Sequence, residues 1–143
     1  MDVFVFDAVV HTLVPTMTPT LRFIILAASL AGFLGVGLGA FGAHALKKTL
    51  TDSGHVTTWQ TAVLYQLIHA VALLALAGVA ANWPNARLIA WCWTLGIVFF
   101  SGSLYWLSLG GPKALGPITP IGGLLFLLGW AALAWNAFRA TKA

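Results

Sequence analysis

Two polar side chains one helical turn apart, Gln66 and His69, are the residues in this sequence best placed to do chemistry. Both lie inside a long apolar stretch, and an imidazole there could relay a proton or bind haem iron. The same imidazole could instead hydrogen bond to another helix, because an unpaired polar group in hydrocarbon costs several kcal/mol. We therefore expect His69 to have a partner, and both interpretations stay open.

A second polar stripe lies further along the chain. Its four hydroxyls are spaced seven, four and three residues apart: Thr94, Ser101, Tyr105 and Ser108. This spacing places them on one face of a helix. From that face they could hydrogen bond to Gln66 and His69 across a helix pair. The pattern predicts a polar seam, which would serve either to fix the packing of two helices or to form a narrow polar pathway.

His44 stands beside Lys47 and Lys48, at the end of an apolar stretch, so we place it at the lipid headgroup boundary. An axial haem pair with His69 is unfavourable, because the two lie about 15 Å apart in depth at ~1.5 Å per residue. The sequence has no metal-spaced ligand cluster, paired carboxylates, nucleophile elbow or phosphate-binding loop. We expect no enzymatic activity, no cofactor and no metal.

The elements that must position these side chains are revealed by gaps between charged residues. There are 24 uncharged residues between Arg22 and Lys47, 34 between Asp52 and Arg87, 25 between Arg87 and Lys113, and 25 between Lys113 and Arg139. A charge at the bilayer centre costs roughly 2.5–3.5 kcal/mol. The gaps therefore predict four membrane spans, at 21–46, 58–81, 88–109 and 120–138. The predicted fold is all-α, an integral membrane antiparallel four-helix bundle with both termini on one side.

Composition supports a membrane protein and argues against other classes. The chain of 143 residues is 60% hydrophobic and 7% charged, and it contains no glutamate. Four spans leave no room for a soluble domain. The net charge of +4 is small and has no basic stripe with interleaved aromatics, so we expect no nucleic-acid partner. The lone Cys92 excludes an intrachain disulfide and is expected to pack in a helix.

Residues 1–20 stand apart from the predicted spans. Their apolar stretch is interrupted by Asp2 and Asp7 and is too short to cross a bilayer. It is either an interfacial segment or the product of a wrongly assigned start, with Met17 as the true one. The orientation rests on a small imbalance of positive charge, four residues against three. One side would carry Arg22, Arg87, Arg139 and Lys142, and the other Lys47, Lys48 and Lys113. The excess favours cytoplasmic termini.

Small residues form stripes in the first and fourth predicted spans. They recur at steps of four and three, or of seven: Ala28, Gly32, Gly35, Gly39 and Gly42, then Gly122 and Gly129. Such stripes let the backbone of another helix approach closely. We interpret them as helix-packing surfaces, with a groove for a ligand or a lipid tail as the alternative.

Four stretches resemble a family of small four-helix bacterial inner-membrane proteins of unknown function that has animal transmembrane relatives. The stretches are 38–44, 59–70, 100–105 and 115–123. The resemblance implies four spans and a bacterial inner (cell) membrane, and it brings no established activity or functional residues. Alternating spans would place His44, Trp59, Gln60, Tyr105, Thr119 and Pro120 at one leaflet. We expect any ligand site, including a contribution from Thr119, to open there.

The most consistent function is non-enzymatic binding of a partner protein or a lipid by an integral membrane protein. The alternative is a small transporter or proton-conducting pore that uses the polar seam, and a haem subunit or membrane enzyme is a third interpretation. Besides membrane lipids, the expected partners are another membrane protein or a second copy of the chain, because four helices leave little bundle interior.

Overall fold

The computed structural model describes residues 17–112 and 116–140, with side chains through Arg139, so the predicted extension falls largely outside the described residues. Every regular element in these ranges is helical. The elements are α2 (Pro19–Ala43), α3 (Lys47–Asp52), α4 (Val56–Val79), the 3₁₀ turn η1 (Ala80–Asn82), α5 (Ala86–Gly96), the π-helical turn η2 (Ile97–Ser101), α6 (Gly102–Ser108) and α7 (Ile118–Ala140). Thr18 begins α2 by accepting a hydrogen bond from the backbone N–H of Leu21 at 3.2 Å.

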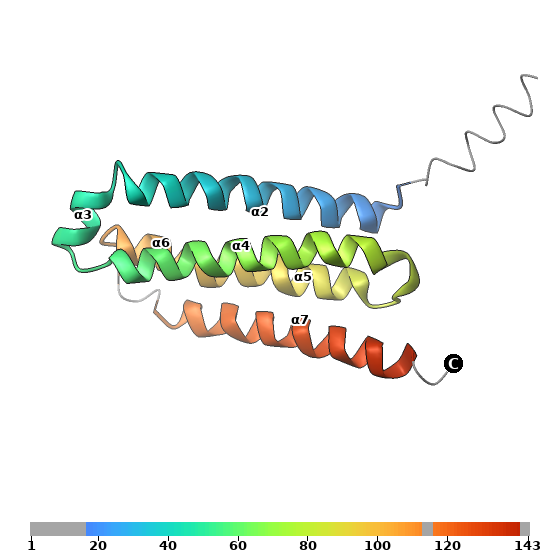
Figure 1. The fold of residues 1–143 in the computed structure, drawn as a ribbon. Helices are drawn as coiled ribbons and strands as arrows, with labels where there is room; N and C mark the ends of the chain where they lie inside the picture. The colour runs from blue at the N-terminus through green and yellow to red at the C-terminus, as the bar shows by residue number, and fades with distance from the viewer. Residues whose placement is uncertain (1–16, 113–115, 141–143) are drawn as a thin grey trace, which may run out of the picture.

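Within the described residues, four helical segments are long and apolar enough to cross a membrane: Pro19–Ala43, Val56–Asn82, Ala86–Ser108 and Ile118–Arg139. The shortest has 22 residues, which at 1.5 Å per residue spans about 33 Å against ~30 Å of hydrocarbon. They run antiparallel, so α2 begins and α7 ends at the same end of the bundle (Figure 1). The prediction of an all-α, four-span membrane bundle is confirmed.

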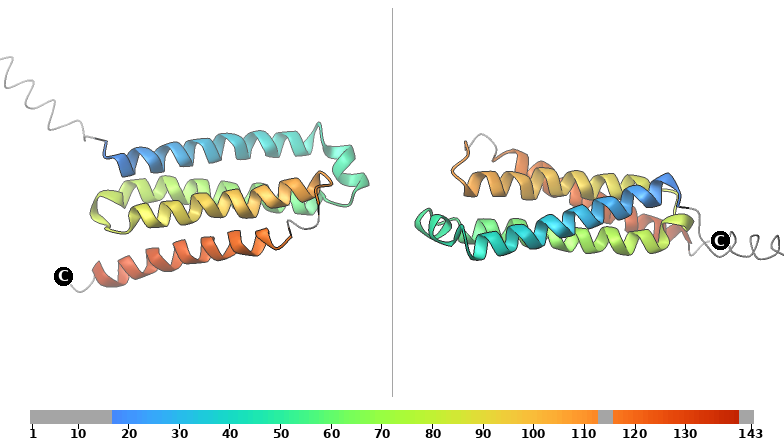
Figure 2. Two further views of the ribbon diagram at one scale, coloured as in Figure 1. Left: turned by 180° about the vertical axis from the view of Figure 1, so that it is seen from behind. Right: turned by 90° about the horizontal axis from the view of Figure 1, so that it is seen from above.

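The four spans do not contribute equally to the interior. The second span (α4) and the third span (α5–η2–α6) occupy the middle, while α2 and α7 flank them on opposite sides (Figures 1 and 2). The main contact of α2 is with α4, and that of α7 is with α5 and η2. Most of the polar side chains that the bundle buries lie on these two central spans.

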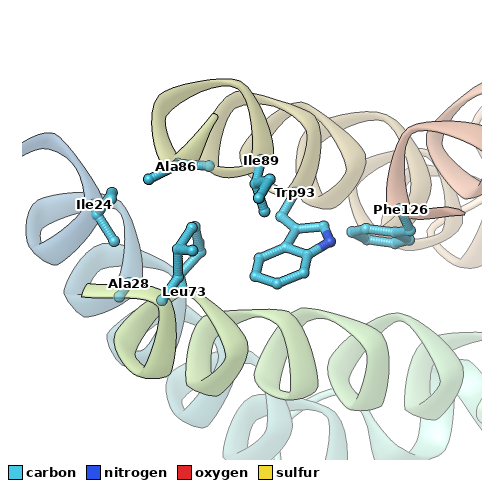
Figure 3. Close-up of a cluster of buried hydrophobic side chains, with 9 residues drawn as sticks. Ile24, Ala28, Leu73, Ala86, Ile89, Trp93 and Phe126 are labelled. Atoms are coloured by element: carbon cyan, nitrogen blue, oxygen red, sulfur yellow. The ribbon is translucent and has the colours of Figure 1, made fainter. Parts of the chain in front are cut away.

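An apolar cluster runs from the end of the bundle where α2 begins toward its middle. Figure 3 shows residues from all four spans in it: Ile24 and Ala28 from α2, Leu73 from α4, Ala86, Ile89 and Trp93 from α5, and Phe126 from α7. All are buried. Dispersion between closely packed atoms holds such a cluster together in lipid, where apolar burial from water contributes little between helices.

The glycine stripe of α2 packs against α4. A Cβ atom on Gly35 would lie 2.6 Å from Leu67 Cδ2, and one on Gly39 would lie 3.3 Å from Val63 Cγ1. On Gly42 it would overlap the indole of Trp59. Glycine is therefore needed for this helix approach.

The stripe of α7 is used in the same way. A Cβ on Gly122 would overlap the backbone of Phe100 in η2, and one on Gly129 would overlap the indole of Trp93. Gly32 differs, because within the described residues no atom lies within 4 Å of the position its Cβ would take. Gly32 faces a shallow groove beside α4 that Leu67, Ala70 and Leu74 also line, so its predicted role in helix packing stays a prediction.

The connection after the first span contains a helix that we did not predict. In α3, Leu50 is buried and anchors the helix to the bundle, while Lys48 pairs with Asp52 at 2.6 Å on the exposed side. Gly54 then adopts a φ of +73°, which lets the chain turn into α4. Six residues are too few for a hydrophobic period to be recognised in sequence.

The third span contains the π-helical turn η2, which sequence periodicity also missed. A π turn adds one residue to the helical circuit and rotates the next part of the helix by about 100° relative to a regular helix. The prediction that Thr94, Ser101, Tyr105 and Ser108 share one face assumed an uninterrupted helix. The π turn begins after Thr94 and ends at Ser101, so it changes the orientation of Thr94 relative to the three later hydroxyls.

Replacing Gly122 by alanine tests the close approach of α7 to η2. The Cβ would meet backbone atoms that cannot rotate away, so Gly122→Ala should lower the free energy of unfolding by about 1–3 kcal/mol, as overpacking does. The matched control is Gly32→Ala, which should leave stability equal or raised, since its Cβ has free space. Unfolding in mixed detergent micelles, followed by circular dichroism, measures both, and equal losses would contradict the packing.

Candidate functional site

Gln66 links three helices through its side-chain amide. Its Nε2 donates to the carbonyl of Ala31 in α2 at 2.8 Å, and its Oε1 accepts from the Tyr105 hydroxyl in α6 at 3.0 Å. The residue is 4% exposed. The predicted hydrogen bond between Gln66 and a hydroxyl of the third span is therefore confirmed.

His69 is equally buried, but its partner is not the predicted one. The indole N–H of Trp130 in α7 donates to His69 Nε2 at 3.2 Å, because an indole nitrogen can only donate. His69 Nδ1 must then carry the proton, which it donates to the carbonyl of Tyr65 at 2.8 Å. The hydrogen bonds thus select the neutral Nδ1–H tautomer. The prediction that His69 bonds to a hydroxyl of the third span is wrong.

Aromatic rings surround the imidazole of His69 and complete its packing. The ring of Phe126 stacks on it with centroids 3.6 Å apart and planes 12° apart. Trp93 and Trp130 contact it edge-on, with centroids at 6.1 Å in both cases. Trp130 could have been suspected from sequence, because it lies in the middle of a span, where an indole N–H needs an acceptor, rather than at an end.

The hydroxyls of the third span do not form one continuous seam. Ser103 hydrogen bonds to Thr119 Oγ1 at 2.7 Å, so the candidate Thr119 joins α6 to α7. Ser108 donates to the carbonyl of Leu104 within its own helix, at 2.7 Å. Ser101 is fully buried, and its hydroxyl has no hydrogen-bond partner among the described residues.

His44 takes no part in these contacts. It caps the C-terminal end of α2 through its backbone N–H, which donates to the carbonyl of Ala40 at 3.1 Å, and the residue is exposed. The sequence candidates thus fall into three places: the interior, the contact between α6 and α7, and the surface. Gln66, His69, Ser101 and Tyr105 lie in the interior. Thr119 lies between α6 and α7, where it bonds to Ser103, a residue not singled out from the sequence, and His44 lies at the surface.

The geometry of the interior group is that of a structural network. Both ends of the Gln66 amide and both nitrogens of His69 are occupied. A second proton on His69 would place two N–H groups against each other at Trp130, so this arrangement does not favour the proton-pathway alternative. Among the described residues, no three His, Cys, Asp or Glu side chains are grouped so that they could hold a metal ion.

A different feature has the shape of a binding site. A groove of about 500 Å³ lies beneath α3, between the last turns of α2 and the first turns of α4. Its lining is mainly apolar and includes Gly39, Gly42, Leu50, Val63 and Leu64, with Lys47, Thr51 and Gln60 as polar members. It opens at the end of the bundle where the sequence placed a candidate site.

Comparison with known proteins assigns the chain to a family. The family model described as a protein of unknown function, DUF423, matches residues 38–123. The UPF0382 membrane protein SH2409 of Staphylococcus haemolyticus is 45% identical over 118 residues, which cover 82% of this chain and 95% of that protein. The chain belongs to this family.

Relatives from other bacteria extend this result. The UPF0382 inner membrane protein YgdD of Escherichia coli is 40% identical over 131 residues, covering 86% of this chain and 95% of that protein. A UPF0382 membrane protein of Haemophilus influenzae is 44% identical over 115 residues, with coverages of 78% and 90%. No solved structure matches the chain.

Membership of the DUF423 family confirms the predicted resemblance and the location. The name of the Escherichia coli relative places that protein in the inner membrane, and four spans make the present chain a multi-pass membrane protein. The matched region holds the whole groove beneath α3 and the Gln66–Tyr105 hydrogen bond, whereas Trp130 lies beyond its end. The family brings no activity to either feature.

The tautomer of His69 can be read directly by nitrogen-15 NMR of the protein labelled at histidine. We expect an N–H-type signal from Nδ1 and an unprotonated signal from Nε2 at neutral pH, because Trp130 donates to Nε2. In Trp130→Phe the Nε2 signal should move, since its donor is lost. A spectrum in which both nitrogens of His69 carry protons would contradict the network.

The link between Gln66 and Tyr105 can be measured by a double-mutant cycle of Gln66→Leu and Tyr105→Phe. Hydrogen bonds between membrane helices contribute about 0.6 kcal/mol on average, with a maximum of about 1.7. We expect a coupling energy in this range from unfolding in mixed micelles. Strictly additive losses of stability would show that the two side chains do not interact.

Proposed function

We propose that this protein is a non-enzymatic membrane protein that binds a lipid, with an acyl chain lying in the groove beneath α3. The observation that carries the proposal is the groove itself. Its volume of about 500 Å³ lies within the range of about 300–1,000 Å³ that small-molecule sites occupy. Three helices form it, and Leu64 on its rim is 55% exposed toward the surroundings of the bundle.

The dimensions of the groove favour a lipid over a protein segment or a second copy of the chain. A helix with its side chains is about 10 Å across, so roughly one turn would fill 500 Å³. One turn is too little for a specific helix–helix contact. An acyl chain is thin and flexible, and the apolar lining from Gly39, Val63 and Leu64 matches its chemistry.

The state of the polar network supports a binding role rather than catalysis or transport. Its most reactive side chain, His69, is buried and has both nitrogens engaged in hydrogen bonds. Gln66 is likewise held at both ends of its amide. Such groups fix the register of the helices, and they thereby hold α2 and α4 in the arrangement that forms the groove.

Filling the groove tests the proposal. Leu64→Trp adds bulk at the rim of the groove, whereas Ile68→Trp adds the same bulk one turn away on an exposed position of the same helix. After purification in mild detergent, native mass spectrometry should find one lipid retained by the wild type and by Ile68→Trp. Retention should fall severalfold in Leu64→Trp, because the tryptophan occupies the space of the acyl chain.

Two outcomes would overturn the proposal. One is equal retention of lipid by both variants, which would mean that the lipid is bound elsewhere or only as bulk annulus. The other is that the wild type retains no lipid and instead carries a stoichiometric protein or a second copy of the chain. Circular dichroism of both variants verifies that neither result reflects unfolding.

A further inference from the structure

The polar end of the groove carries a positive charge. Lys47 lines the groove and is exposed. Its neighbour Lys48 does not line the groove and forms an ion pair with Asp52 at 2.6 Å on the outer side of α3. Among the residues that the structure describes, Lys47 has no carboxylate partner. The two adjacent lysines thus differ: Lys48 is engaged outside the groove, while Lys47 lines the groove without a carboxylate partner among the described residues.

The backbone of Lys47 is held in place by the packing of α3. Leu50 is 1% exposed and anchors the helix on the bundle. The Thr51 hydroxyl donates to the Lys47 carbonyl at 2.7 Å, and the N–H of His55 donates to the Leu50 carbonyl at 2.9 Å as the chain turns into α4. The side chain of Lys47 therefore starts from a fixed point at the mouth of the groove rather than from a loose loop.

The position of α3 sets the depth at which this charge acts. The helix joins the end of one membrane span to the start of the next, so it lies at the boundary between hydrocarbon and water. Headgroup phosphates lie at the same depth. Below α3 the lining is apolar, from Gly39 and Val63 to Leu67. The site thus has a positive charge at the level of the headgroups and an apolar lining below it. This order matches the headgroup and acyl chain of an anionic lipid.

We propose that the groove selects a lipid with an anionic headgroup, whose phosphate contacts the Lys47 ammonium group while one acyl chain lies along Gly39, Val63 and Leu64. This inference rests on the proposed function, because it names the headgroup of the lipid bound there. Gln60, at the rim, can add an amide N–H to the headgroup oxygens. A zwitterionic headgroup brings its own cation next to Lys47 and is disfavoured.

The test is a competition between two lipids with identical acyl chains. Delipidated full-length protein in a neutral detergent is given equal amounts of phosphatidylglycerol and phosphatidylcholine, and the bound species are counted by native mass spectrometry. One lysine near an anionic lipid contributes about fivefold in affinity. The wild type should therefore prefer phosphatidylglycerol about fivefold, and Lys47→Gln should bind both lipids equally.

Two further variants separate a specific contact from diffuse attraction. Lys47→Arg should keep the preference, because the charge stays at the mouth of the groove. Lys48→Gln should also keep it, because this lysine is paired with Asp52 outside the groove. If Lys48→Gln loses the preference as fully as Lys47→Gln, only the general surface charge attracts the lipid, and the inference is wrong.

The remaining outcomes distinguish this inference from the function on which it rests. If the wild type binds both lipids equally and Leu64→Trp binds neither, the groove is a lipid site without headgroup selection, so only the inference fails. If the wild type binds neither lipid, the proposed function fails, and the inference fails with it.

Discussion

The side-chain amide of Gln66 is the interaction on which the arrangement of helices depends. In hydrocarbon, no water competes for a hydrogen bond, and an amide left unpaired there is costly. One register of α2, α4 and α6 satisfies both ends of this amide, through the carbonyl of Ala31 and the hydroxyl of Tyr105. A slide of any of the three helices by one turn would break at least one of these bonds. The amide therefore supplies the specificity that apolar packing in lipid lacks.

The fourth span, α7, is positioned by steric contacts at two glycines. Gly122 lets α7 touch the backbone of the π turn at Phe100, and Gly129 leaves space for the indole of Trp93. That approach brings Trp130 within reach of His69 Nε2 and stacks Phe126 on the imidazole. The hydrogen bond from Trp130 to His69 thus depends on the glycine contacts, because without the close approach of α7 the imidazole would lack its donor.

The membrane spans could be predicted from the sequence, whereas features that depend on local geometry could not. The spans are revealed by gaps in charge, because burying a lysine or an arginine in hydrocarbon is expensive anywhere along a helix. The bond from Tyr105 to Gln66 could be expected from the need of a buried amide for a partner. The π turn at Ile97–Ser101 has no sequence period, so the orientation of Thr94 relative to Ser101 could not be read from the spacing. The partner of His69 was missed because only the hydroxyls of the third span were considered, although the mid-span position of Trp130 indicated an indole N–H in need of an acceptor.

The spacing of the glycines in α2 left two interpretations open, a helix-packing surface and a groove, and in the structure both apply. Gly39 and Gly42 both touch α4, at Val63 and Trp59, and both line the space beneath α3. Because glycine has no side chain, it lets the backbones of α2 and α4 approach closely. For the same reason, it leaves the space beside this contact unfilled. A larger residue at either position would push α4 away and occupy the groove at once. Helix packing and a candidate binding surface are therefore two consequences of the same glycine stripe. Leu50 of α3 is buried and lines the groove on the side of α3.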